Sequence, residues 1–205
     1  MVNNTKVLRL IGLAMRAGKV KFGSDSCMEA IIQNKIKVLS GAQLKYIAFL
    51  SMLIDHTNKA LIYPNLNGGR LNTVSDIFDI IGRIAFPIFA FLLVEGFFKT
   101  RSRAKYLATL LVFGVISEVP FDLFTTKQFF EPNWNNIMFT LALVLVTIWM
   151  IDVLKKKMEK FPKILWFLLS FVILAVMCLI AAILSLDYDY HAILIGYFYY
   201  IFHGR

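Results

Sequence analysis

The chain has 205 residues, 59% of them hydrophobic with 19 Phe among them, and its mean hydropathy is +0.68. These values lie far above those of soluble globular domains, so they exclude an ordinary soluble domain and indicate that the lipid bilayer is the solvent. The formal net charge of +9 would also suit a nucleic-acid-binding protein, and the distribution of the basic residues has to decide between the two classes.

The first 39 residues differ in character from the rest of the chain. Their pattern predicts a helix, a Gly-containing turn with a short strand, a second helix and the start of another strand. The second helix would be capped by Ser24 or Asp25. The words "SGAQ", Ser40 to Gln43, mark the predicted boundary between a cytoplasmic N-terminal segment, 1–39, and a membrane domain, 40–205.

This N-terminal segment resembles the first half of the small ribosomal-protein-like domains that bind kink-turn RNA. The resemblance rests on "GLAMRAGK", Gly12 to Lys19, and on Gly23 followed by a helix that ends in Lys35 and Lys37. It covers about 38 residues, and a chain below about 40 residues rarely folds alone. We therefore expect a partial RNA-binding-domain-like remnant and no nucleic-acid partner. The alternative is a basic amphipathic helix lying on anionic lipid.

The remainder of the chain contains a succession of apolar windows, and a spanning helix needs roughly 20 mostly apolar residues. The sequence predicts an all-α, polytopic transmembrane helix bundle of about six spans, preceded by a short basic α/β-like segment. The windows are about 44–63, 76–98, 105–125, 136–154, 163–186 and 190–203, the last shortened by the end of the sequence.

The basic residues divide unequally between the two ends of these spans. If the N-terminus is cytoplasmic, 18 of the 22 Lys and Arg residues fall on the cytoplasmic side, as the positive-inside rule expects. The basicity is therefore interpreted as topology, with membrane lipid as the partner. The four exceptions are Lys59, Arg70, Arg83 and Lys127.

Several polar groups lie inside the predicted spans, where an ionisable side chain costs roughly 2.5–3.5 kcal/mol. Six of them come from four spans at one predicted depth, which favours a shared polar cavity. Arg83 and Glu95 are twelve positions apart and cannot pair with each other on one helix. Each is expected to need another helix. The six groups are Asp55, His56, Arg83, Glu118, Asp122 and Asn136.

Simpler interpretations exist for several of these groups. Glu95 lies within one turn of Lys99 and could form a local ion pair. His56 alone could be a hydrogen-bonding contact between helices, and Asp187 could be a solvated loop charge. Two prolines bear on the same region, because Pro87 is expected to bend the second span and Pro120 to break the end of the third. These positions are all visible in the sequence.

Four words of the sequence resemble the TraX family, which is named for an inner-membrane protein of conjugative plasmids needed to acetylate the N-terminus of pilin. The words cover most of residues 44–155, although "DHTNKA" lacks the glycine usual after the histidine. They are "LKYIAFLSMLIDH" (Leu44 to His56), "IIGRIAFPIFAFLLVEGFFKTRSRAKY" (Ile80 to Tyr106), "ISEVPFDL" (Ile116 to Leu123) and "NIMFTL" (Asn136 to Leu141).

The resemblance implies a multi-pass protein of the bacterial inner membrane, grouped with transmembrane acyltransferases. It implies acetyl-CoA as the co-substrate and, as the acceptor, an amine or hydroxyl on a pilin-like peptide or a small molecule. The expected reaction transfers an acetyl group to an acceptor in the membrane or outside the cytoplasm.

Acetyl transfer requires a base for the proton of the acceptor and a donor to stabilise the developing oxyanion. His56 is the predicted base, because imidazole exchanges protons near neutral pH. Asp55 is a candidate to orient its ring, although neighbours on a helix point about 100° apart, which leaves Glu118 or Asp122 open for that role. Arg83 is the candidate oxyanion donor. The predicted catalytic residues are His56, Asp55, Glu118 and Arg83, and the predicted substrate-binding residues are Asp122, Asn136 and Glu95.

The alternative function is a non-enzymatic transporter or scaffold, in which buried charges line a substrate path or hold helices together. It predicts flux or partner binding without a covalent product. The sequence shows no Gly-rich phosphate loop and no Cys/His set with metal-ligand spacing, so no metal site is expected.

Overall fold

A computed structural model describes residues 39–66, 70–131 and 134–203. The chain divides into two compact units, residues 1–43 with Arg205 and residues 44–204, and the contacts discussed below lie in the second unit. The predicted N-terminal segment, with its resemblance to an RNA-binding domain, lies outside the described residues except for Leu39. In the first unit, Ser40 and Gln43 form a reciprocal capping box, in which each side chain bonds the other's backbone N–H at 3.2 and 2.8 Å.

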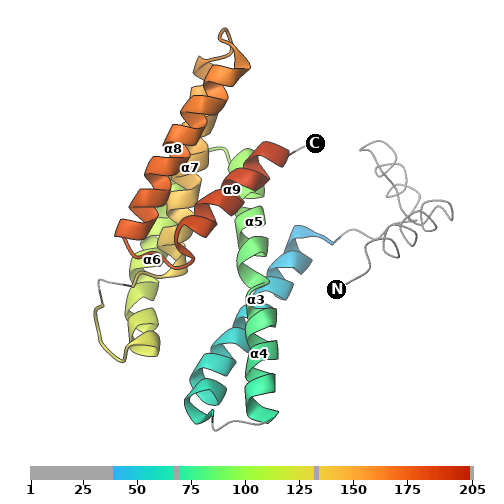
Figure 1. Cartoon of the computed structure of the whole chain (residues 1–205), viewed down its shortest axis with the longest axis vertical. Helices are drawn as coiled ribbons and strands as arrows, with labels where there is room; N and C mark the ends of the chain where they lie inside the picture. Colours follow the sequence, from blue (N-terminus) through green and yellow to red (C-terminus); the bar gives the residue numbers. More distant parts are fainter. Residues whose placement is uncertain (1–38, 67–69, 132–133, 204–205) are drawn as a thin grey trace, which may run out of the picture. The chain divides into compact units, whose positions relative to one another are not determined.

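Seven α-helices account for most of the described residues (Figure 1). Four helical stretches are long and apolar enough to cross a membrane, namely Leu71–Lys99, Arg103–Thr125, Ile137–Lys157 and Lys163–Ile183. This confirms the predicted all-α, polytopic transmembrane helix bundle, although four of the about six predicted spans are found among the described residues, and the windows 44–63 and 190–203 are not among those four. The helices are α3 (Gly41–Thr57), α4 (Arg70–Gly82), α5 (Ala85–Lys99), α6 (Arg103–Thr125), α7 (Ile137–Lys157), α8 (Lys163–Ile183) and α9 (Asp189–Phe202), with a π-helix η1 (Asn58–Ile62) and a 3₁₀-helix η2 (Tyr63–Asn65) after α3.

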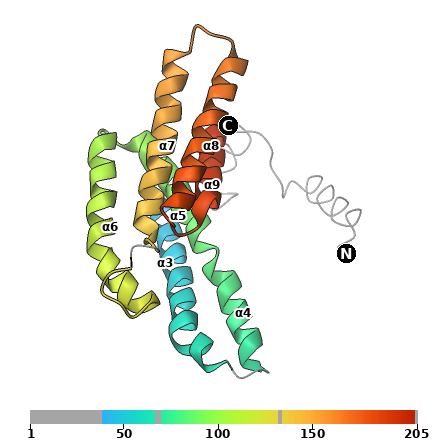
Figure 2. The same ribbon diagram turned by 60° about the vertical axis from the view of Figure 1, so that its left-hand side comes forward.

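Helix α7 is the centre of the bundle, because it contacts α5, α6, α8 and α9. Figures 1 and 2 both show α7 and α8 running side by side. The fully buried residues of α7 include Val144, Leu145, Ile148 and Ile151. Helix α9 approaches it closely at Gly196, where an added Cβ would lie 2.2 Å from a methyl carbon of Val144. The small residue thus permits the tight helix contact that packing in a membrane requires.

The outward faces of the bundle are apolar. Helix α8 exposes Phe171 and Leu179 by 72% and 64%, while Ser170 on its inner face is buried. Exposed apolar area of this extent would be costly in water and is expected where a helix meets lipid tails.

Both prolines behave differently from the sequence expectation. The second predicted span is divided into α4 and α5 by a turn at Arg83 and Ile84, and Pro87 lies in the first turn of α5 instead of at the bend. A proline there loses little, since first-turn N–H groups lack helical partners anyway. Pro120 does not break the third span, because α6 continues through it to Thr125.

Candidate functional site

Helix α3 uses one face to bind α4. Ser51, Asp55 and Asn58 follow each other at helical spacing, so their side chains share that face. The Ser51 hydroxyl donates to the carbonyl of Ile81, and the Asn58 amide donates to the carbonyl of Ser75 at 3.1 Å. Polar groups thus hold these two helices together where lipid offers no alternative partner.

Asp55 occupies the middle of this face. Its carboxylate forms an ion pair with Lys59, one helical turn away, at 2.7 Å. Its side chain packs directly on Gly82, where a Cβ would lie 2.5 Å from that of Asp55. Any larger residue at position 82 would push the carboxylate away from α4.

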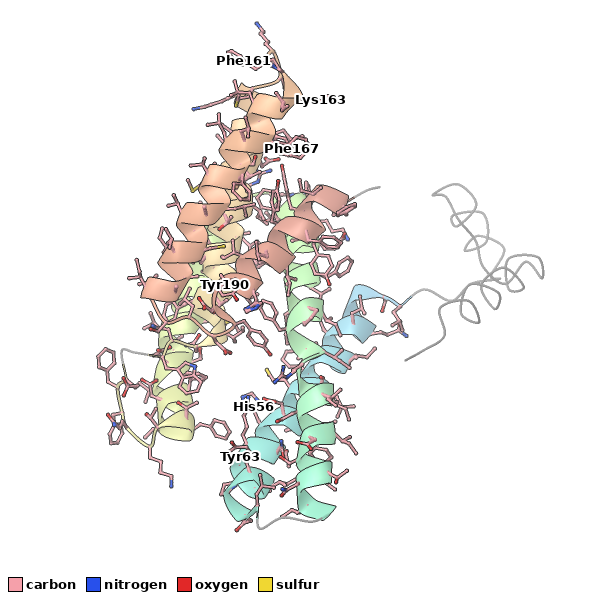
Figure 3. The ribbon with its side chains drawn as sticks, in the orientation of Figure 1. His56, Tyr63, Phe161, Lys163, Phe167 and Tyr190 are labelled. Carbon is pink, nitrogen blue, oxygen red and sulfur yellow. The ribbon has the colours of Figure 1, made fainter. Side chains whose placement is uncertain are left out.

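His56 points to the other side of α3, away from α4 (Figure 3). Its ring stacks on Phe124 of α6, with centroids 5.2 Å apart. The Nδ1 atom lies 2.8 Å from the carbonyl oxygen of Met52. A carbonyl can only accept a hydrogen bond, so Nδ1 carries the proton in the neutral ring and Nε2 keeps its lone pair. With 45% of the side chain exposed, His56 is oriented and accessible.

The partner that orients His56 is therefore a backbone carbonyl, rather than one of the carboxylates expected for that role. The nearest oxygen of Asp55 is 3.7 Å from Nδ1, longer than a hydrogen bond, and that oxygen belongs to the pair with Lys59. Asp55 still places a negative charge beside the ring.

The connection between α8 and α9 brings further polar groups to this region. It is tied to the start of α7, because the N–H of Asn135 donates to the carbonyl of Ser185 at 3.2 Å and the hydroxyl of Thr140 donates to that of Asp187 at 2.8 Å. Tyr188 has a left-handed backbone with φ 63° and stacks on Phe86 at 4.2 Å. This anchoring fixes where Asp187 lies.

Asp187 faces the charges of the α3 end. Burial raises the pKa of the Asp187 carboxyl, and the positive charge of Lys59 offsets part of that rise. Burial and the neighbouring Asp187 charge raise the pKa of Tyr188 to about 12, and Arg83 acts in the opposite direction. We call Asp55, His56, Lys59, Arg83 and Asp187 the His56 cluster, since these side chains share one electrostatic environment.

Glu118, Asp122 and Asn136 form a second group between α6 and α7. Asn136 caps α7, since its side-chain oxygen accepts from the N–H of Met138 at 2.9 Å. Its amide donates to the Glu118 carboxylate and to the carbonyl of Gly114. Asp122 is fully buried, and one of its oxygens accepts from the N–H of Glu131 at 2.9 Å. These contacts hold the backbone at Gly114, Glu131 and Met138 in place. Substrate binding by Asp122 and Asn136 stays a prediction.

The two groups meet through α6 and α7. On α6, Phe124 stacks on the His56 ring and lies two residues from Asp122. On α7, Thr140 donates to the Asp187 carbonyl and lies one turn from Asn136. The contacts of the described residues thus divide the six predicted polar groups into two sets that are linked only through α6 and α7, and one shared polar cavity for all six stays a prediction.

Glu95 lies elsewhere. Its carboxylate pairs with Lys99 at 2.5 Å and with His203 at 2.9 Å, so the local ion pair named as the simpler interpretation is present. The expectation that Glu95 needs another helix holds only for His203, since Lys99 belongs to the same helix. Substrate binding by Glu95 also stays a prediction.

A third group surrounds Asp152, near the end of α7, and we call it the Asp152 cluster. Arg103 of α6 donates to its carboxylate at 2.7 Å, Lys156 lies at 3.2 Å, and the hydroxyl of Tyr200 of α9 donates at 3.2 Å. Arg103 also lies over the ring of Phe97, 4.1 Å from its centroid. The cluster joins α5, α6, α7 and α9.

A cavity of about 1010 Å³ opens between α3, α5, α6 and α7, at the end of α3 opposite His56. We call it the Lys45 cavity. Its polar lining comes from Lys45, Lys99, Thr100, Arg101, Ser102, Lys105 and Thr109, and its apolar lining includes Phe49, Phe89, Leu92, Leu93, Leu110, Met138 and Leu141.

Fold and polar clusters together define a multi-pass helical membrane protein that keeps ionisable groups between its helices. The chain belongs to the TraX family, described as TraX protein, which matches residues 40–205. It is also 36% identical over 116 residues to the probable fimbrial assembly protein FimC, serogroup H1, of Dichelobacter nodosus. That match covers 53% of this chain and 45% of the relative, so the chain spans less than half of it. No solved structure matches.

Two contributors to these groups were given no role in the sequence interpretation. They are Tyr188, a stacked phenol, and Asp152, a largely buried carboxylate. Asp152 carried a usable signal, because a carboxylate inside a predicted span with Lys156 one turn away is a typical buried partner for a cation. No comparable signal marks Tyr188, whose position depends on long-range backbone contacts.

Proposed function

We propose that the protein is a membrane-bound acyltransferase that transfers an acetyl group from acetyl-CoA to an amine or hydroxyl of an acceptor in the membrane or outside the cytoplasm. The observation that carries the proposal is the state of His56. Its Nδ1 proton is held by Met52, its Nε2 lone pair is free to take a proton, and its side chain is 45% exposed.

His56 acts in this proposal as the general base. Its Nε2 takes the proton of the acceptor amine or hydroxyl while that group attacks the acetyl carbonyl, and the Asp55 carboxylate 3.7 Å from Nδ1 stabilises the resulting imidazolium. The co-substrate supplies an activated thioester whose sulfur leaves. The proposal assigns to Arg83, which is exposed in the turn between α4 and α5, the stabilisation of charge on the carbonyl oxygen.

The proposed location is the bacterial inner membrane, with the N-terminus in the cytoplasm. The excess of Lys and Arg at the Lys45 end supports this orientation. It puts the His56 cluster toward the outer face, where a peptide acceptor would arrive. The similarity to a probable fimbrial assembly protein favours a fimbrial or pilin-like peptide over a small molecule as that acceptor.

The test is a transfer assay with the purified chain in lipid nanodiscs. Radiolabelled acetyl-CoA is incubated with a pilin N-terminal peptide or a small amine, and the acetylated product is identified by mass spectrometry. His56→Ala should abolish product, and added imidazole should restore part of it, because the exposed site admits a small base. Normal transfer by His56→Ala would remove this residue from the mechanism.

The second candidate is a transporter or scaffold, which the ion pairs between different helical segments favour, Arg103 with Asp152 and His203 with Glu95. It predicts that nanodiscs with the wild-type chain form no acetylated product with any acceptor, while binding or flux of a substrate depends on Asp55 and Asp187.

A further inference from the structure

The Lys45 cavity differs from the rest of the molecule in its charge. Among the described residues that line it there are four cations and no carboxylate. Lys99 is paired with Glu95, whereas no carboxylate of the described residues lies within ion-pair distance of Lys45, Arg101 or Lys105. Cations left unpaired around a cavity favour an anionic ligand.

Topology alone does not account for this arrangement. Other basic residues at the same membrane end are either paired, as Arg103 and Lys156 are with Asp152, or lie outside the cavity at the connection between α7 and α8, as Lys157, Lys160 and Lys163 do. The three unpaired cations of the cavity come instead from three places, the start of α3, the turn after α5 and the start of α6. They converge on one space.

The cavity also has the size and lining of a ligand site. Its volume of about 1010 Å³ is at the upper end of small-molecule sites, which run to roughly 1,000 Å³. Besides the cations, the lining includes the hydroxyl-bearing Ser102 and Thr109 and apolar residues such as Phe49, Phe89 and Met138. Such a lining suits a ligand with charged phosphates at one end and an uncharged arm at the other.

The separation between the Lys45 cavity and the His56 cluster can be estimated along α3. Lys45 and His56 lie eleven positions apart on α3, which corresponds to a rise of roughly 17 Å. A ligand held by its phosphates near Lys45 therefore needs an arm of about that length to bring a reactive group to His56. The same helix would then carry a binding group at its start and the proton acceptor at its end.

We infer that the Lys45 cavity binds the phosphate groups of an amphiphilic ligand through Lys45, Arg101 and Lys105. Naming this ligand as the acyl donor rests on the proposed function, whereas the recognition of phosphate does not. The structure accordingly assigns phosphate recognition to one end of α3 and proton transfer to the other.

The experiment measures binding of coenzyme A, and of its phosphorylated nucleotide portion, to the chain in nanodiscs of zwitterionic lipid. The test variant carries Lys45→Gln, Arg101→Gln and Lys105→Gln. The matched control carries Lys157→Gln, Lys160→Gln and Lys163→Gln, which removes the same charge from the same membrane end. All six side chains are exposed, so the substitutions should not disturb folding.

The expected result is that the test variant binds coenzyme A weaker by about ten-fold or more, while the control stays within about two-fold. Added salt should weaken wild-type binding and have less effect on the test variant. Equal affinity in both variants, or an equal loss in both, would overturn the inference. A parallel arm without nucleotide uses nanodiscs that contain phosphatidic acid. Cavity-dependent binding of that lipid alone would support phosphate recognition and overturn the assignment of the ligand as acyl donor.

Failure of this inference can be told apart from failure of the proposed function. His56→Ala should bind coenzyme A like the wild type while transferring nothing. Cavity-dependent binding without transfer by the wild type would leave the phosphate site standing and overturn the acyltransferase proposal. If the test variant still transferred acetyl and bound coenzyme A with the wild-type affinity, the acyltransferase proposal would stand and the phosphate site would be overturned.

Discussion

The Asp152 cluster and the His56 cluster hold similar charges at opposite ends of the helices, yet they are built differently. Asp152 is 7% exposed and receives Arg103, Lys156 and the Tyr200 hydroxyl, so its charge is fully compensated. His56 is half exposed, and among the described residues only its Nδ1 has a hydrogen-bond partner. A charge inside a membrane protein that is fully paired holds helices together, whereas an oriented group with a free lone pair is available for chemistry.

The largest effect is expected for His56→Ala and concerns the rate of acetyl transfer, which should separate the His56 cluster from the Asp152 cluster. His56→Ala should lower acetyl transfer by on the order of 100- to 10,000-fold, the usual contribution of a general base. It should change the free energy of unfolding little, because the lost contacts are one backbone hydrogen bond and one exposed ring contact. Transfer rates and titration with a denaturing detergent measure the two. A loss of stability as large as that of an Asp152 variant would contradict the contrast.

Asp152→Ala should have the opposite profile. Removing the carboxylate leaves Arg103 and Tyr200 without their partner, which costs about 3 kcal/mol in the free energy of unfolding. Asp152→Asn, which keeps a group that can accept from Tyr200, should lose less. The measurement is the same detergent titration. Transfer per folded molecule should stay normal, and a specific fall in transfer would show that this cluster is not purely structural.

Asn136→Ala should come next, at about 2 kcal/mol, since it removes the cap of α7 and leaves the Glu118 carboxylate without the side-chain donor of residue 136, while the backbone N–H at 3.4 Å remains. Asn136→Ser, which retains the cap and loses the donor to Glu118, should recover roughly half of that loss. Equal stability of the Ala and Ser variants would mean that the cap contributes nothing.

The smallest effect is expected for Asp55→Asn. The pair with Lys59 is open to solvent on the lysine side, and such pairs contribute about 1 kcal/mol or less. The detergent titration should therefore separate Asp55→Asn clearly from Asp152→Asn. Equal losses for the two would show that the His56 cluster is as structural as the Asp152 cluster.

The spans were predictable from the sequence because hydropathy is a local property. The four helical stretches that could cross a membrane fall within or around the predicted windows 76–98, 105–125, 136–154 and 163–186. The division of the second window was not predictable, since the turn at Arg83 and Ile84 lies away from Pro87, the residue that attracts attention. Continuation of α6 through Pro120 was likewise not predictable, because a proline inside a helical pattern usually indicates a break.

The site was predictable in its members more than in its contacts. His56, Asp55 and Arg83 stand out because ionisable groups in apolar sequence are rare. Their partners do not, because Met52 orients His56 through a carbonyl that every residue possesses. Asp187 joins them because Asn135 and Thr140 bind the connection between α8 and α9, for example through the bond from Asn135 to Leu184, 49 positions further along the chain. Contacts of that separation are set by the packing of helices and leave no local pattern.

Helix α7 begins beside the amide of Asn136 and passes through Asp152 without a break. These residues are sixteen positions apart, which corresponds to a rise of about 24 Å. One continuous helix therefore contributes to the group that supports the His56 cluster at its start and to the ion pairs of the opposite membrane face near its end. Because α7 is continuous, it tilts as one body, and a tilt of α7 at one face of the membrane also changes its position at the other face. Events on the two sides of the bilayer are thereby mechanically joined.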